Sequence, residues 1–345
     1  MTRLIQLGTP EVSGAPQSGL LADSFGRVHS DLRISVTDRC NIRCFYCMPE
    51  EGAEFAPRSS LVSFTEIERF IYAALPLGIT KIRLTGGEPL LRPRLPELIA
   101  RLCEQAGLRD LALTTNGVLL ETYARALFDA GLRRLNVHLD TLDRERFRTI
   151  TRRDDLRRVL AGIEAARNLG FQIKLNAVAI KGLNEPDIPS LVRFGRENGI
   201  EVRFIEFMPL DAQELWAMDR VLTADEMIES IEREFGPLVP VPDADPRAPA
   251  TEYRFADGTR VGFIASISKP FCGNCNRLRL TSDGKMRNCL FARDEVDIKP
   301  LLASDELQQR LQTAIRQTVW SKWAGHDIQR SSFVAPDRPM YSIGG

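Results

Sequence analysis

Short runs of apolar and β-branched residues recur along this chain, each followed by a turn and a stretch with helical spacing. The runs predict strands at residues 32–37, 81–85, 111–115, 135–139, 173–180 and 202–207. The intervening patterns predict helices at residues 65–74, 95–105, 121–130, 156–169 and 188–198. Six strand–helix units are therefore expected from about residue 31 onward.

Strands that alternate with helices predict a parallel sheet, because a parallel crossover needs a long connection. The sheet could be open and doubly wound, or it could curve as a barrel. A barrel is favoured because unusual polar residues follow the predicted strand ends, at 40–47, 86–89, 114–117, 138–141 and 206–209. We expect an α/β fold, an incomplete (β/α)6 TIM-like barrel whose rim carries the chemistry.

A segment rich in Pro, Ala and Asp interrupts these patterns at residues 236–250. It predicts a linker at 237–250, between a partial barrel at 23–236 and a C-terminal domain at 251–345 that closes the barrel mouth. Residues 1–22, which precede the first strand–helix unit, are expected to be an N-terminal extension. A hairpin is expected at 251–255 and 260–264, joined by a turn at 256–259. On general grounds the tail at 338–345 is expected to be a frayed terminus.

Composition excludes several classes of protein. The chain has 345 residues, 43% of them hydrophobic, which is enough to bury a large core. Lys plus Arg and Asp plus Glu both total 46, so net charge gives no reason to expect nucleic acid or an anionic membrane as a partner. No apolar run reaches the roughly 18–20 residues of a membrane span, and the first residues lack the apolar core of a secretory signal. We expect a cytoplasmic protein.

Six of the seven cysteines form two triplets, which are Cys40, Cys44 and Cys47, and then Cys272, Cys275 and Cys289. In a reducing compartment this spacing favours metal ligands over disulfides. A zinc site normally has four protein ligands, and only three His are present to complete one, with His29 nearest the first triplet. A cubane iron–sulfur cluster on three cysteines leaves one iron open to a ligand. The seventh cysteine, Cys103, is expected to be a small buried apolar residue of helix 95–105.

The first triplet has C-x3-C-x2-C spacing with Tyr46 before its last cysteine, and the motif Gly86, Gly87, Glu88, Pro89 follows one unit later. Together they resemble the radical S-adenosylmethionine superfamily. The C-terminal motif Cys-x2-Cys-Asn-Arg-x-Arg at 272–279, with Cys289 and the final Gly-Gly, resembles the GTP 3',8-cyclase family of molybdenum cofactor biosynthesis. The resemblance runs from about residue 23 to residue 345.

This resemblance implies two 4Fe-4S clusters and S-adenosylmethionine as cofactors. Cys40, Cys44 and Cys47 would ligate the cluster whose open iron binds S-adenosylmethionine. An external one-electron reductant would drive its cleavage, and the 5'-deoxyadenosyl radical would abstract the ribose 3' hydrogen of GTP. The product would be (8S)-3',8-cyclo-7,8-dihydroguanosine 5'-triphosphate, and this conversion of GTP would be the first step of molybdenum cofactor biosynthesis. The cluster on the second triplet, Cys272, Cys275 and Cys289, would bind the guanine end of GTP.

Family positions for S-adenosylmethionine match Tyr46, Gly87 and Met208, although a Met after an apolar strand also fits core packing. The family usually has Ser where this chain has His138. An imidazole can hydrogen-bond a ribose or carboxylate, or it can pack behind the site. Both roles stay open for His138.

Substrate positions implied by the resemblance are mostly cationic, as a triphosphate requires. They are Arg33, Arg83, Thr114, Lys174, Arg277, Leu278 and Arg279. Arg203 is a further candidate, because a charge that alternates into an apolar strand is expected to face the barrel lumen. The terminal Gly344 and Gly345 would enter the active site, where residues without side chains can approach a ligand closely.

Two other classes fit part of this pattern. One is a radical enzyme that modifies peptides or sulfatases, but such enzymes usually carry more than three C-terminal cysteines. The other is a zinc-stabilised binding module, for example for RNA. About eight irons per chain would favour two cubane clusters, whereas zinc without sulfide would exclude them. Monomer and homodimer both remain open, as does the purpose of the N-terminal extension.

Overall fold

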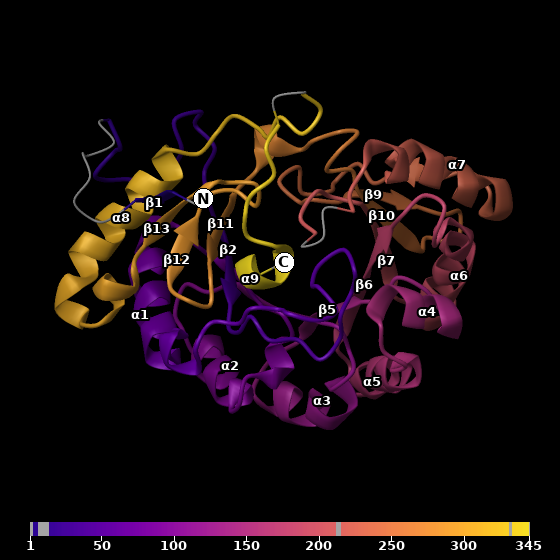
Figure 1. Ribbon diagram of the computed structural model, residues 1–345, viewed down its shortest axis with the longest axis horizontal. Coiled ribbons are helices and arrows are strands. Elements are labelled where there is room, and N and C mark those ends of the chain that lie inside the picture. Colours follow the sequence, from indigo (N-terminus) through magenta and orange to yellow (C-terminus); the bar gives the residue numbers. More distant parts are fainter. Residues whose placement is uncertain (1–2, 6–13, 212–214, 331–332, 345) are drawn as a thin grey trace.

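A single curved sheet forms the centre of the molecule, with helices on its outer side (Figure 1). The computed structural model describes residues 3–5, 14–211, 215–330 and 333–344. Within that part of the chain the sheet has 13 strands in the order β1-β13-β12-β11-β2-β3-β4-β5-β6-β7-β10-β9-β8. Their bounds are β1 Arg3–Ile5, β2 Asp31–Ser35, β3 Lys81–Thr85, β4 Asp110–Thr115, β5 Arg134–His138, β6 Gln172–Ala179, β7 Glu201–Glu206, β8 Val239–Pro240, β9 Thr251–Arg254, β10 Arg260–Ile264, β11 Arg277–Leu280, β12 Lys285–Arg287 and β13 Asp294–Asp297.

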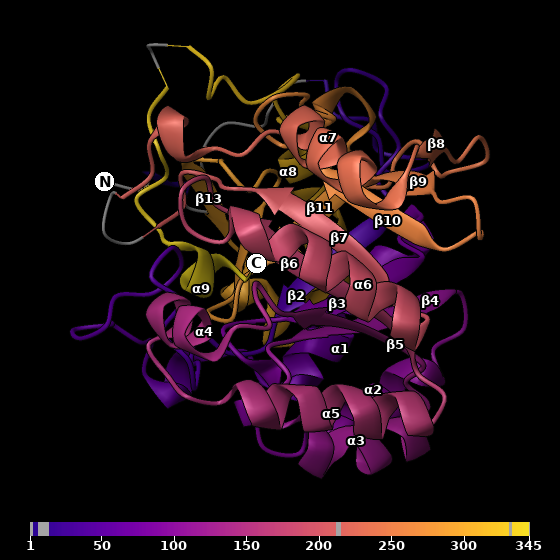
Figure 2. The same ribbon diagram turned by 90° about the vertical axis from the view of Figure 1, so that its right-hand side faces the viewer.

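The helices lie along the convex side of this sheet, except for the last, which lies inside its curve (Figures 1 and 2). They are α1 Phe64–Ala74, α2 Leu95–Cys103, α3 Leu120–Asp129, α4 Arg144–Thr151, α5 Leu156–Asn168, α6 Ile188–Asn198, α7 Ala224–Phe235, α8 Gln308–Trp320 and α9 Met340–Ile343. In α1 a capping box between Ser63 and Glu66 begins the helix, and Ile67, Phe70 and Ile71 form its buried stripe. The core lies between such stripes and the sheet.

The six predicted strands are confirmed as β2 to β7, with ends that differ by one or two residues. Each pairs in parallel with the next along the chain. The five predicted helices are confirmed as α1, α2, α3, α5 and α6. The partial parallel barrel is therefore the observed architecture, and its strand C-terminal ends meet at one rim.

Residues beyond the predicted linker extend this same sheet at both edges. Strand β10 pairs in parallel with β7, while β11 pairs in parallel with β2 at the opposite edge. The predicted hairpin is confirmed as β9 and β10, and the linker segment itself contains β8. The C-terminal segment thus reaches both sides of the barrel opening without leaving the sheet.

Two expectations from the sequence are wrong. Cys103 is exposed, because it lies one residue beyond Leu102 and therefore off the apolar stripe of α2. The tail is not frayed over the described residues 338–344, since Tyr341 and Ile343 of α9 are buried. Gly345 lies outside the described residues. Among the described helices, none combines the length and apolar character needed to cross a bilayer.

Candidate active site

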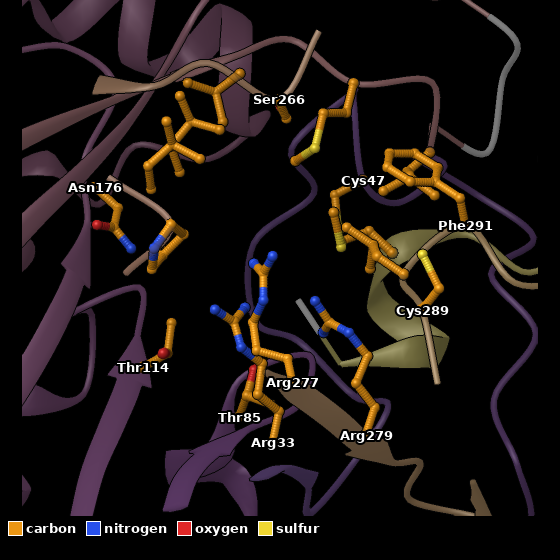
Figure 3. Close-up of a pocket in the computed structure, with 18 of the residues that line it drawn as sticks. Arg33, Cys47, Thr85, Thr114, Asn176, Ser266, Arg277, Arg279, Cys289 and Phe291 are labelled. Atoms are coloured by element: carbon orange, nitrogen blue, oxygen red, sulfur yellow. The ribbon is translucent and has the colours of Figure 1, made fainter. Parts of the chain in front are cut away.

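Both cysteine triplets line one cavity of about 280 Å³ inside the curve of the sheet. Figure 3 shows thiols of both triplets, Cys47 and Cys289, on one side of it, with Thr114 and Asn176 opposite. The side chains of Arg33 on β2 and of Arg277 and Arg279 on β11 extend into the space between these two sides (Figure 3). Sequence positions far apart are therefore joined in a single site.

The loop after β2 carries the first triplet and is built largely from local hydrogen bonds. The amide of Cys47 donates to the carbonyl of Cys44 at 2.9 Å, and Arg43 donates through Nη1 to the carbonyl of Cys40 at 2.7 Å. The amide of Arg43 also donates to the carbonyl of Thr151, which ties the loop to the end of α4. The three thiols are thus placed by a short segment of chain.

These thiols lie in apolar surroundings. Burial, with a smaller contribution from the nearby Glu88 carboxyl, raises the pKa of the Cys40 thiol to about 12. Burial also raises the pKa of Cys47 well above its usual range. Such thiols stay protonated until a metal displaces the proton, as is usual for cluster ligands.

Among the described residues, no group of three His, Cys, Asp or Glu could hold a single metal ion. A cubane cluster binds each cysteine to a different iron, so its ligands surround the cluster and do not meet at one point. Three thiols around a cavity therefore fit a cluster. His29 does not join this set, because it does not line the cavity and its Nε2 lies 3.8 Å from Asp23 Oδ2.

The glycine pair after β3 is explained by close packing on the first cysteine loop. A Cβ on Gly86 would lie 2.5 Å from the carbonyl oxygen of Thr37, and one on Gly87 would lie 2.4 Å from that of Arg39. The amide of Gly87 donates to the Thr37 carbonyl at 2.7 Å. Any side chain here would displace the loop that carries the cysteines.

The carboxyl of the next residue, Glu88, is fully buried behind this turn. It accepts hydrogen bonds from Thr115 Oγ1 at 2.8 Å and from the amides of Asn116 and Leu90 at 2.7 and 3.0 Å. Burial raises the pKa of Glu88 to about 7, although these hydrogen bonds oppose the shift. Glu88 therefore joins the turn to the end of β4 and does not line the cavity.

His138 lies in the cavity wall and belongs to a three-residue network. The hydroxyl of Tyr46 donates to Asp140 Oδ2 at 2.5 Å and lies 2.5 Å from His138 Nε2. Asp140 in turn accepts from the amide of Val178 at 2.7 Å through Oδ1. Burial lowers the pKa of His138, but the charge of Asp140 outweighs it and raises the pKa to about 10.

Cationic groups occupy the floor of the cavity. The Nε atoms of Arg33, Arg83 and Arg277 are buried and have no hydrogen-bond partner among the described residues. Burial lowers the pKa of Arg33 well below its usual range, and the neighbouring Arg279 and Arg83 lower it further. Buried cations with unused donors are costly unless an anion pairs with them, so this floor fits a polyanionic ligand.

Three predicted substrate residues are placed differently from the others. Lys174 does not line the cavity and pairs with Glu201 at 2.7 Å and Glu252 at 3.4 Å. Arg203 lines the cavity, but it also pairs with Glu201 and Glu252, at 2.5 and 2.7 Å. Leu278 is buried in the hydrophobic core, because neighbours on a strand point to opposite faces.

Asn176 is one of the cavity residues that sequence reasoning missed. Asn176 follows Lys174 by two positions on β6, so it shares its face of the strand but lies nearer the rim (Figure 3). The alternation along β6 was sufficient to find it. The predicted Tyr46, Gly87, Thr114 and Met208 all line the cavity.

The second triplet is assembled from separate segments. Cys272 and Cys275 flank a single 3-10 turn before β11, and Cys289 follows β12. Arg277 Nη2 donates to Cys275 Sγ at 3.3 Å. Burial favours the neutral thiol of Cys275, but the charges of Arg277 and Lys322 outweigh it and lower the pKa to about 6.

The C-terminal tail reaches the edge of this site. Arg279 Nη1 donates to the carbonyl of Gly344 at 2.7 Å. Gly344 has φ of +88°, and a Cβ there would lie 2.7 Å from the Cβ of Ser35 on β2. Both features require a residue without a side chain at position 344.

Comparison with known proteins agrees with this site. Residues 34–195 match the family model described as the Radical SAM superfamily, and residues 200–328 match Molybdenum Cofactor Synthesis C. A crystal structure of Streptococcus suis SuiB bound to S-adenosylmethionine has the same fold, with a TM-score of 0.54 and 17% identity over 76% of this chain and 60% of that chain. Native anSMEcpe with bound AdoMet gives a TM-score of 0.52 and 16% identity over 75% of this chain and 74% of that chain.

Curated relatives are much closer in sequence. The GTP 3',8-cyclase of Rhodopirellula baltica is 48% identical over 94% of this chain and 92% of its own length. That of Mycobacterium sp. (strain KMS) is 45% identical over 98% and 99%, and that of Streptomyces coelicolor is 44% identical over 94% and 96%. The chain therefore belongs to the GTP 3',8-cyclase family of radical S-adenosylmethionine enzymes.

Proposed function

We propose that this enzyme converts GTP to (8S)-3',8-cyclo-7,8-dihydroguanosine 5'-triphosphate, using a separate 4Fe-4S cluster on each cysteine triplet. The observation that carries this proposal is that both triplets line one cavity, whose floor holds buried arginine donors without partners. The arrangement suits a reaction in which a cofactor on one side meets a polyanionic substrate on the other.

The first triplet, with Tyr46, Gly87, His138 and Met208, forms the S-adenosylmethionine side in this proposal. When bound, the reduced cluster and S-adenosylmethionine supply a 5'-deoxyadenosyl radical that abstracts the ribose 3' hydrogen of GTP. The protein has no proton to transfer in that abstraction and acts by positioning. His138 and Asp140 orient the hydroxyl of Tyr46, and the apolar thiol surroundings exclude water.

The second triplet forms the substrate side, where its cluster would hold the guanine end of GTP. Arg33, Arg83 and Arg277 offer buried Nε donors to the triphosphate, and Thr114 adds a hydroxyl. Lys174 and Arg203 could join them only by leaving Glu201 and Glu252. Arg279 holds the carbonyl of Gly344, which keeps the tail beside this side of the cavity, and a catalytic role for Gly344 and Gly345 is part of the proposal.

The cell must supply the remaining components. We propose an external one-electron reductant and a cytoplasmic location, because a reducing compartment keeps the cluster thiols free of disulfides. Neither nucleic acid nor a membrane is part of the proposal, since the 46 basic and 46 acidic residues balance. The protein could act as a monomer or a homodimer.

Anaerobic turnover tests the function. The reconstituted enzyme is incubated with GTP, S-adenosylmethionine and dithionite, and both 5'-deoxyadenosine and cyclised nucleotide are measured. The proposal predicts the two products in equal amounts. Deoxyadenosine without any product from GTP would retain the radical chemistry and reject GTP as the substrate.

A further inference from the structure

Two buried cations outside the reacting groups contact the backbone that carries the second cysteine triplet. They are Arg27, from the segment before β2, and Lys322, just after α8. Neither was singled out by a motif, and neither belongs to the arginine floor described above. Their donors are directed at carbonyl oxygens of the cysteine segments.

Arg27 holds Cys272. Its Nη1 donates to the carbonyl of Cys272 at 2.7 Å and to that of Ala324 at 2.8 Å, while Nη2 donates to the carbonyl of Trp323 at 2.5 Å. The side chain is only 8% exposed. One planar guanidinium therefore joins the turn at Cys272 to the segment that follows α8.

A buried carboxylate fixes this guanidinium. Asp23, whose side chain is fully buried, accepts from Arg27 Nε at 2.5 Å. Its other oxygen accepts from the backbone amides of Phe25 and Arg27, both at 3.0 Å. The Asp23 carboxylate thus fixes the orientation of the guanidinium that contacts the cysteine turn.

Lys322 holds the segments beside the other two cysteines. Its Nζ donates to the carbonyl of Arg277 at 2.8 Å and to that of Asn288 at 2.7 Å. Arg277 lies two residues after Cys275, and Asn288 lies directly before Cys289. Lys322 is 4% exposed, so these carbonyls are its partners in place of water.

We infer that Arg27 and Lys322 are positioning residues that hold the second cysteine triplet in the arrangement that binds a cluster. Between them they contact the backbone at or beside all three cysteines, of which Cys289 lies in a different segment from Cys272 and Cys275. The inference rests on the proposed second cluster, and it gives Arg27 and Lys322 a role in holding that cluster's ligands.

The test compares Arg27→Lys, Lys322→Met and a milder variant, Asp23→Asn, with the unchanged protein. A lysine cannot replace Arg27, because the guanidinium donates through two separate nitrogens to the three carbonyls while its Nε binds Asp23. A single ammonium does not have this planar arrangement of donors. The matched control is Arg316→Ala. Arg316 also ties the N-terminal segment to the C-terminal part, through a hydrogen bond to the carbonyl of Gly19, but this bond does not involve the cysteine segments. Each protein is reconstituted anaerobically and assayed for iron, sulfide and the electron paramagnetic resonance of its reduced clusters.

We expect about eight irons for the unchanged protein and for Arg316→Ala, and a fall toward about four in Arg27→Lys and Lys322→Met, with a smaller loss in Asp23→Asn. The remaining signal should still shift on addition of S-adenosylmethionine, which shows that the barrel and the first cluster are intact. Retention of about eight irons in all variants would overturn the inference, and so would equal loss of both clusters, which indicates a general folding role. About four irons in the unchanged protein would instead refute the second cluster and the proposed function with it.

Discussion

The two cysteine triplets face one cavity but are constructed in opposite ways. Cys40, Cys44 and Cys47 lie in one loop that its own hydrogen bonds shape, and burial there raises the pKa of Cys40 and Cys47. The second triplet is contacted by the neighbouring Arg277 and by two distant parts of the chain, Lys322 and the N-terminal segment that carries Arg27. The first site is formed by a single loop in apolar surroundings. The second site is formed by separate segments of the chain and lies beside cationic side chains.

This difference matches the proposed ligands. S-adenosylmethionine carries a sulfonium, so a radical-generating site gains from low polarity and from exclusion of water. GTP carries a triphosphate, so its site needs fixed cations. Burial favours the neutral thiol of Cys275, but Arg277, which would also bind substrate, helps to lower its pKa, so one residue links the two properties of the second site.

Loss of the first cluster should have the largest effect. Cys44→Ser is expected to abolish formation of 5'-deoxyadenosine, by at least about 1,000-fold, because no other group can cleave the sulfonium. About four irons should remain on the second triplet. Product chromatography and iron analysis measure the two quantities, and residual deoxyadenosine near the level of the unchanged protein would contradict separate roles for the triplets.

Removal of the tail should separate turnover from cluster content. A chain that ends at Ile343 loses the carbonyl that Arg279 holds, so cyclised product should disappear while both clusters and the melting temperature persist. Gly344→Ala should act in the same direction, because φ of +88° and the contact with Ser35 exclude a Cβ. Gly258→Ala is the matched control, since Gly258 has φ of +83° but no atom lies within 4 Å of a Cβ at that position. An active truncated enzyme would refute the role of the tail.

Loss of one floor arginine should weaken GTP and leave S-adenosylmethionine unaffected. Hydrogen bonds to charged groups contribute about 1.5–3 kcal/mol, so Arg33→Ala should raise the Kd for GTP roughly 10- to 100-fold. Arg134→Ala provides the comparison, because Arg134 lies on β5, pairs with Asp110 and does not line this cavity. Calorimetric titration of both variants with both ligands measures the effect. Equal weakening by the two variants would show that net charge, not position, binds the nucleotide.

The smallest effect concerns the thiols of the metal-free protein. Cys40 and Cys275 are both partly exposed, but the pKa of Cys275 is about 6 and that of Cys40 is about 12. At pH 7 Cys275 is mostly thiolate and Cys40 is neutral, so iodoacetamide should alkylate Cys275 faster, by at least about tenfold. Peptide mass spectrometry against pH should place the rise in Cys275 modification near pH 6, with no such rise for Cys40. Equal rates of alkylation at Cys275 and Cys40 would contradict an electrostatic difference between the two triplets.

The sequence was sufficient for the local part of this structure. Strand periodicity located β2 to β7, and the spacing of Cys40, Cys44 and Cys47 identified the first site because its geometry lies within one loop.

Tertiary contacts determined what the sequence could not provide. No periodicity shows that β10 and β11 close onto opposite edges of one sheet, or that Arg27 would reach Cys272 across most of the chain length. Lys174 was expected in the cavity but pairs with two glutamates, one of them on a distant strand. Each of these features depends on partners that sequence spacing does not bring together.

The central claim is that each triplet holds its own cluster with its own ligand. It is tested by electron paramagnetic resonance of two reduced variants, in which either Cys40, Cys44 and Cys47 or Cys272, Cys275 and Cys289 are replaced by Ser. The account predicts that the signal of the first variant shifts with GTP but not with S-adenosylmethionine, and that the second variant responds in the opposite way. A variant without the first triplet that holds no cluster, or one that responds only to S-adenosylmethionine, would contradict it.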